Sequence, residues 1–78
     1  MGAHMTAIKK IESFLRTNPG SAYCDDCLSE ILDIRPRQQV QQKTSQLARY
    51  NRYWRQSCVC ARCHEVRIVI RLRMALVR

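Results

Sequence analysis

Apolar residues recur at helical spacing in the first half of the chain. This period predicts one amphipathic helix over residues 6–17 and a shorter second helix over residues 25–33. The residues that form the two apolar stripes are Ile8, Ile11, Leu15, Leu28, Ile31 and Leu32. Acidic residues stand in the first turn of the second helix, where they suit the positive end of the helix dipole.

A third helix is predicted from Pro36 to about Tyr50, because proline is favoured at the first helical position and Val40, Thr44 and Leu47 fall on one face. The remaining positions are almost all polar or basic, and none is acidic. They include Arg37, Gln38, Gln39, Gln41, Gln42, Lys43, Ser45, Gln46 and Arg49. A helix face that is merely solvated usually contains glutamates that pair at i, i+4, so this face is unusual.

The hydrophobic period changes to two in the last third of the chain. Residues 53–57 have strand composition, and residues 66–73 alternate, with Val66, Ile68, Ile70 and Leu72 on one face. A cysteine-containing segment lies between the two strands, at the tip of the predicted hairpin. The predicted fold is therefore α+β, with the element order α-α-α-β-β.

Five cysteines mark the most specific chemistry in the sequence. Cys24 and Cys27 form one C-x-x-C pair, and Cys60 and Cys63 form a second after 32 intervening residues. Two residues between thiolates allow a tight turn to direct both sulfur atoms to one ion, and two such turns complete a tetrahedron. The sequence therefore predicts a four-cysteine site for a structural zinc ion, with no open coordination position for catalysis.

Other ligand sets and other chemistry stay open. Cys58 could replace Cys60, and His64 could replace Cys63. Disulfides are disfavoured because the cysteine count is odd and no signal peptide is evident. A redox C-x-x-C pair is disfavoured because no βαβ pattern surrounds either pair.

Charge divides the chain into two halves. Residues 5–34 carry three basic and five acidic residues, whereas residues 35–78 carry eleven basic residues and one acidic residue. A basic half of this strength favours a polyanionic partner, most often nucleic acid. Solubility alone is the alternative explanation.

The length limits the chain to one small domain. Residues 1–4 read like a cloning remnant, so we expect a zinc-stabilised domain over residues 5–78. So short a chain is unlike an enzyme with a buried cleft, and no small-molecule substrate is evident. Its apolar runs are too short to span a membrane, and we expect a cytoplasmic location.

The predicted order resembles the winged helix–turn–helix superfamily of DNA-binding domains. A helix with Leu-x-x-x-Leu spacing from Leu28, a short turn at Ile34 and the polar helix after Pro36 resemble its helix–turn–helix core. Residues 46–55 resemble its passage into the first wing strand. The cysteines depart from this pattern, because an ordinary wing tip is glycine-rich or basic.

The resemblance implies that the third helix lies in the major groove of double-stranded DNA. Its candidates for contacts with base edges are Arg37, Gln38, Gln41, Gln42 and Ser45. Phosphate contacts would then fall to Lys43, Arg49, Arg52 and Arg55, and also to Arg67, Arg71 and Arg73 on the outer face of the wing. The function this implies is a small prokaryotic transcriptional regulator, which could act as a homodimer.

Two other functions remain possible from the sequence. The basic surface could dock on an acidic protein partner. Tyr50, Tyr53 and Trp54 could stack on the bases of RNA or single-stranded DNA, although aromatic residues at a helix–strand corner are more often core.

Overall fold

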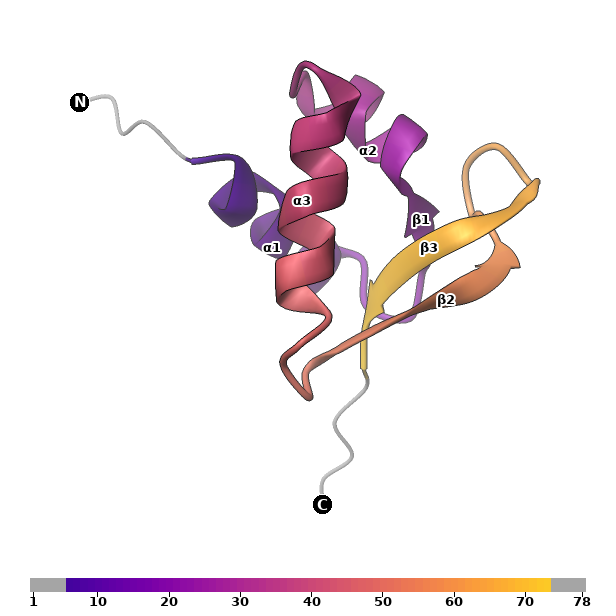
Figure 1. Ribbon diagram of the computed structural model, residues 1–78. Coiled ribbons are helices and arrows are strands. Elements are labelled where there is room, and N and C mark those ends of the chain that lie inside the picture. Colours follow the sequence, from indigo (N-terminus) through magenta and orange to yellow (C-terminus); the bar gives the residue numbers. More distant parts are fainter. Residues whose placement is uncertain (1–5, 74–78) are drawn as a thin grey trace.

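Three helices pack beside a three-stranded antiparallel sheet in the computed structural model, which describes residues 6–73 (Figure 1). The elements are α1 (Ala7–Thr17), β1 (Tyr23–Cys24), α2 (Asp25–Leu32), α3 (Arg37–Leu47), β2 (Tyr53–Val59) and β3 (Val66–Leu72). The α+β class is confirmed, but the order α-α-α-β-β is wrong because β1 lies between α1 and α2. The suspected remnant at residues 1–4 and the last five residues of the expected domain lie outside the described residues.

The ends of α1 and α2 follow from local hydrogen bonds. The backbone amide of Lys9 donates to Thr6 Oγ1 at 3.3 Å, so Thr6 is the N-cap of α1. At the other end, Asn18 Nδ2 donates to the Phe14 carbonyl at 2.9 Å. Asp33 ends α2 in the left-handed conformation, with φ at 54°, and aspartate tolerates this conformation better than most residues do.

Helix α3 is shorter than the sequence predicts. It begins at Arg37 with Pro36 as its N-cap residue and ends at Leu47 rather than near Tyr50. The next residues form a tighter turn, in which the amide of Tyr50 donates to the Leu47 carbonyl at 3.0 Å. This turn reverses the direction of the chain before β2 begins at Tyr53.

The sheet has the strand order β1-β3-β2. Strands β2 and β3 pair along their full lengths, from Tyr53 opposite Leu72 to Val59 opposite Val66. Strand β1 pairs only through Tyr23 opposite Ile70 and Cys24 opposite Val69. A strand of two residues shows no hydrophobic period, which is why the sequence did not predict it.

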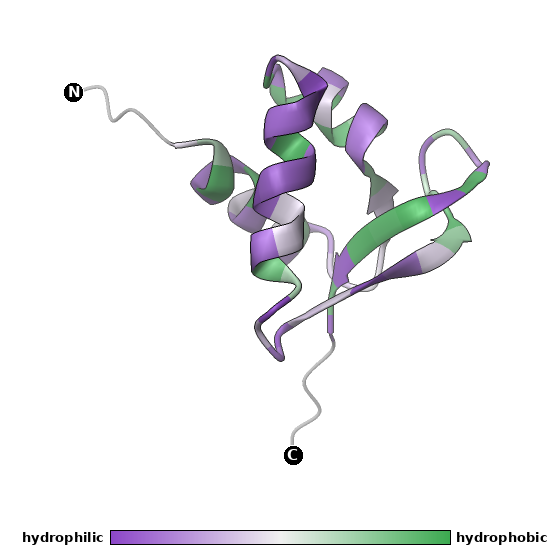
Figure 2. Ribbon diagram, viewed as in Figure 1, coloured by the Kyte–Doolittle hydropathy of each residue, from purple (hydrophilic) through white to green (hydrophobic). Residues whose placement is uncertain are grey.

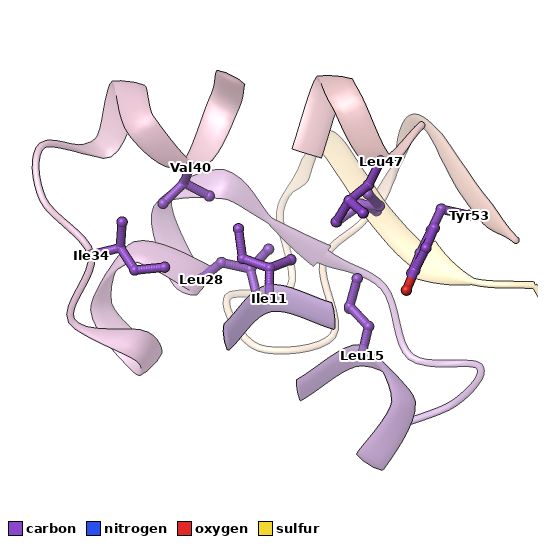
Figure 3. Close-up of a cluster of buried hydrophobic side chains, with 8 residues drawn as sticks. Ile11, Leu15, Leu28, Ile34, Val40, Leu47 and Tyr53 are labelled. Atoms are coloured by element: carbon purple, nitrogen blue, oxygen red, sulfur yellow. The ribbon is translucent and has the colours of Figure 1, made fainter. Parts of the chain in front are cut away.

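The main core lies between the helices and the adjacent end of the hairpin (Figure 3). Figure 3 shows side chains from α1, α2, α3 and β2 that point toward one another. The buried residues of this cluster are Ile11, Leu15, Leu28, Ile34, Val40, Leu47, Tyr53 and Ile70. The cluster fixes one face of α3 against α1 and α2, so the opposite face is left to solvent.

The alternation predicted for β3 fails toward the hairpin tip. Val66 and Ile68 are 68% and 48% exposed, whereas the consecutive residues Val69 and Ile70 are both fully buried. Ile70 joins the main core, and Val69 packs with buried cysteines on the other side of the sheet. The distal part of the hairpin projects past the main core (Figure 1), and Val66 and Ile68 do not belong to that core.

Candidate functional site

The two C-x-x-C pairs come together in space. The sulfur atoms of Cys24, Cys27, Cys60 and Cys63 all lie within 4.8 Å of one another. Cys24 ends β1 and Cys27 lies in the first turn of α2, while the second pair lies in the loop that joins β2 to β3. The cluster therefore connects the hairpin tip to the beginning of α2.

The backbone around Cys60 is arranged to support a thiolate. The amides of Cys24 and Arg62 donate to Cys60 Sγ, each at 3.4 Å. The amide of Ala61 donates to the Ala22 carbonyl at 2.7 Å, which ties this loop to the segment before β1. His64 adopts a positive φ of 65° and closes the turn by donating its amide to the Cys60 carbonyl at 2.9 Å.

The cysteine environments favour different protonation states in the absence of a metal. Burial raises the pKa of Cys24 to about 12 and also raises the pKa of Cys27. Burial acts in the same direction on Cys60, but amide hydrogen bonds from Cys63, Cys24 and Arg62 outweigh it and lower its pKa to about 6. A metal ion that binds here would meet one preformed thiolate and displace protons from its neighbours.

The distances between sulfur atoms suit a tetrahedral metal ion. Metal–sulfur bonds of about 2.3 Å at tetrahedral angles place sulfur atoms about 3.8 Å apart. Cys24 Sγ lies 3.9 Å from Cys63 Sγ, and Cys60 Sγ lies 3.7 Å from Cys27 Sγ. The four cysteines can therefore bind a metal ion.

The two alternative ligands lie elsewhere. Cys58 is exposed on β2, opposite Arg67, and does not belong to the cluster. The His64 side chain is exposed and is not part of the cluster either. Of the ligand sets open from the sequence, the structure favours the two C-x-x-C pairs.

A buried ion pair lies directly beside the cysteine cluster. Asp25 and Arg55 form two hydrogen bonds of 3.2 Å, and their side chains are only 6% and 14% exposed. Thr44 Oγ1 donates to Asp25 Oδ1 at 2.9 Å and lies 2.8 Å from Arg55 Nη1. This network joins α2, α3 and β2.

The placement of Arg55 corrects the expectation that it is a surface phosphate contact. Its guanidinium group points into the protein, because the buried carboxylate of Asp25 needs a partner. The sequence did not reveal this network, since the two residues are 30 positions apart and no period connects them. The one available signal was an aspartate next to a candidate metal ligand at the start of a helix.

The outer face of α3 is exposed and polar. Figure 2 shows that this helix is mainly hydrophilic, whereas β3 is mainly hydrophobic. Five side chains at helical spacing line a shallow depression on it: Gln38, Gln41, Gln42, Ser45 and Gln46. Four of the five predicted base-contacting residues therefore share one surface.

Two of the predicted DNA-contacting arginines converge on one carboxylate. Arg37 Nε, at the start of α3, pairs with Asp26 Oδ1, and Arg67 Nη1, from β3, donates to Asp26 Oδ2 at 3.0 Å. Arg67 also donates to Glu65 at 3.0 Å. Arg37 thus pairs with the start of α2, and it is not one of the residues that line the depression on α3.

The remaining basic candidates are spread over the surface. Arg49, Arg52 and Arg73 are exposed, and Lys43 is half-buried. The guanidinium carbon of Arg71 lies 4.5 Å from the ring centre of Trp54, which is cation–π geometry.

The three aromatic residues have different environments. Tyr53 is buried in the main core and Trp54 packs against the cysteine cluster, whereas Tyr50 is exposed. The two residues that begin β2 thus serve packing.

Comparison with known proteins gives no relative from which a function can be transferred. No family model, curated protein or solved structure matches the chain. None of the helices described is long and apolar enough to cross a membrane.

Proposed function

We propose that this chain is a sequence-specific, double-stranded DNA-binding domain of the winged helix–turn–helix class, with α3 in the major groove. The observation that carries the proposal is the exposed face of α3, which presents glutamine and serine side chains at helical spacing and no acidic residue. Glutamine can form two hydrogen bonds with adenine, and an α-helix fits the major groove. In this proposal the domain is a small transcriptional regulator.

The rest of the fold supports this docking. Three helices followed by a β-hairpin are present, and β1 adds a third strand without changing the order of the other elements. The core attaches α3 by Val40, Thr44 and Leu47, so the opposite face is free to meet a duplex. Arg49 and Arg52 are exposed beyond the end of α3, where they can contact phosphates.

In the same proposal the four cysteines bind a structural zinc ion. Four thiolates at these spacings are a common zinc ligand set, and a zinc ion with four protein ligands has no open position for a substrate. The bound ion would offset half of the charge of the four thiolates and join the loop at the hairpin tip to α2. Binding free energy of this kind is also folding free energy, which a chain of this size needs.

A titration with labelled random duplex tests DNA binding. The metal-loaded protein is titrated at about 50 and 200 mM salt, because each phosphate contact makes the affinity for DNA fall more steeply as the salt concentration rises. We expect binding that weakens at least several-fold across this range. Absence of binding at the lower salt concentration would overturn the proposal.

A protein-docking function is the second candidate, and the distal hairpin favours it. Val59, Val66 and Ile68 are about half exposed or more, and the strand register places them next to one another. Contiguous exposed apolar surface commonly marks an interaction site. In this case binding to random duplex would be weak, and Val66→Lys would abolish capture of the partner without affecting DNA.

A further inference from the structure

A groove separates α3 from the β2–β3 hairpin, and charged side chains lie along it. Arg37 and Gln41 line it from α3, Arg67 and Ile68 line it from β3, and Asp26 lines it from the start of α2. The groove is continuous with the exposed face of α3, because Gln41 belongs to both. A duplex held by α3 would therefore extend across it.

One carboxylate that lines the groove, that of Asp26, lies between two guanidinium groups. Asp26 is 41% exposed, and its partners Arg37 and Arg67 are 52% and 43% exposed. All three side chains are therefore accessible to a ligand. Ion pairs between groups exposed to this extent are individually weak, so a competing anion can separate them.

A phosphodiester group is a suitable competitor. It carries one negative charge, as a carboxylate does, and it accepts hydrogen bonds from guanidinium groups in the same forked geometry. Arg37 comes from the proposed recognition helix and Arg67 from the hairpin, so one phosphate between them would contact both elements. The carboxylate of Asp26 now lies at that position.

We infer that one strand of the DNA backbone passes along this groove and that its phosphate replaces the Asp26 carboxylate between Arg37 and Arg67. Asp26 is thus an internal competitor that lowers the affinity for DNA. Arg37 is then a phosphate contact rather than a base contact. This inference rests on the proposed DNA-binding function.

The test compares Asp26→Asn with a matched control, Asp33→Asn. Asp33 also pairs with an arginine, Arg35, at 3.3 Å, but both of those side chains are about 80% exposed at the end of α2. The two variants lose the same charge by the same chemical change. Asparagine also tolerates the left-handed backbone at position 33.

Both variants and the parent chain are loaded with metal and titrated with random duplex at several salt concentrations. Each phosphate contact adds about 0.9 to the slope of log affinity against log salt. We expect Asp26→Asn to bind several-fold more tightly than Asp33→Asn at low salt. The slope should be about equal in the two variants, because the same phosphate is contacted in each. In a chain that also carries Arg37→Gln and Arg67→Gln, Asp26→Asn should give no gain over the double arginine variant.

The outcomes separate the inference from the function on which it rests. If the parent binds DNA in a salt-dependent way but the two aspartate variants have equal affinity, the inference is wrong and the proposed function stands. If neither the parent nor any variant binds duplex, the proposed function fails. If Asp26→Asn melts without cooperativity, the arginine changes decide: Arg67→Gln must reduce the slope of the parent by about 1, and an unchanged slope overturns the inference.

Discussion

Replacing Arg55 by methionine distinguishes the structure from the expectation drawn from the sequence alone. As an exposed phosphate contact, Arg55 could be replaced with a loss of DNA affinity and little change in stability. In the structure, its guanidinium group is the charged partner of the buried Asp25 carboxylate. Methionine keeps an apolar stem of similar length but leaves that carboxylate with only the Thr44 hydroxyl. We therefore expect Arg55→Met to destabilise the fold.

The size of the effect follows from the burial of the pair. Breaking a buried ion pair by removing one partner costs about 3–5 kcal/mol, because the other charge remains desolvated. A chain of this length has a total unfolding free energy of about 4–12 kcal/mol. The melting temperature should fall by about 12–40 °C, since each kcal/mol corresponds to about 4–8 °C in a domain of this size.

The assay is urea unfolding, followed by circular dichroism, with metal kept in excess. Arg49→Met is the control, because Arg49 is exposed and its replacement should change the unfolding free energy by less than about 0.5 kcal/mol. Adding Asp25→Asn to Arg55→Met should restore part of the loss, since a neutral amide still accepts the Thr44 hydrogen bond. Equal stability of Arg55→Met and Arg49→Met would refute the buried pair.

Three further predictions concern the metal, the core and α3. Chelation of the metal, or Cys24→Ser, should abolish cooperative melting. The fluorescence emission of Trp54, the only tryptophan, should change at the same time, because its ring packs against the cysteine cluster. A cooperative melt retained after metal removal would contradict a structural metal. Leu28→Ala should cost about 2–5 kcal/mol in urea unfolding, because Leu28 is fully buried; a cost below about 1 kcal/mol, typical of surface sites, would contradict that packing. Gln42→Ala should reduce discrimination between a selected operator and random duplex by about 1–3 kcal/mol, whereas Arg52→Ala should weaken both equally; equal losses for the two variants would count against α3 as the base-reading helix.

Much of the helical part could be predicted from the sequence because its information is local. The 3.6-residue period of α1 and α2 and the cap at Thr6 each lie within one short segment. The spacing of the two C-x-x-C pairs similarly predicted which four sulfur atoms would meet, because each pair needs only one turn to bring its sulfurs together. The structure places these four atoms together and leaves Cys58 outside.

The parts that the sequence did not predict depend on contacts between distant segments. Strand β1 exists because Tyr23 and Cys24 pair with β3, and two residues have no period of their own. The exposure of Val66 depends on how far the hairpin extends past the helices, which strand alternation does not encode. The partner of Arg55 could not be read from local patterns either, because Asp25 lies 30 positions away in the chain.

The start of α2 connects the cysteine cluster to the proposed DNA surface through three consecutive residues. Cys24 belongs to the cysteine cluster, Asp25 binds Arg55 and Thr44, and Asp26 lies between the arginines of α3 and β3. A metal ion that fixes Cys24 therefore also fixes the two carboxylates that follow it in the chain. Loss of the metal would disturb the hairpin and both arginine contacts together, because all of them meet at this one turn. The cysteine cluster and the orientation of α3 are thus parts of one structural unit, although none of the four cysteines lies on α3 itself.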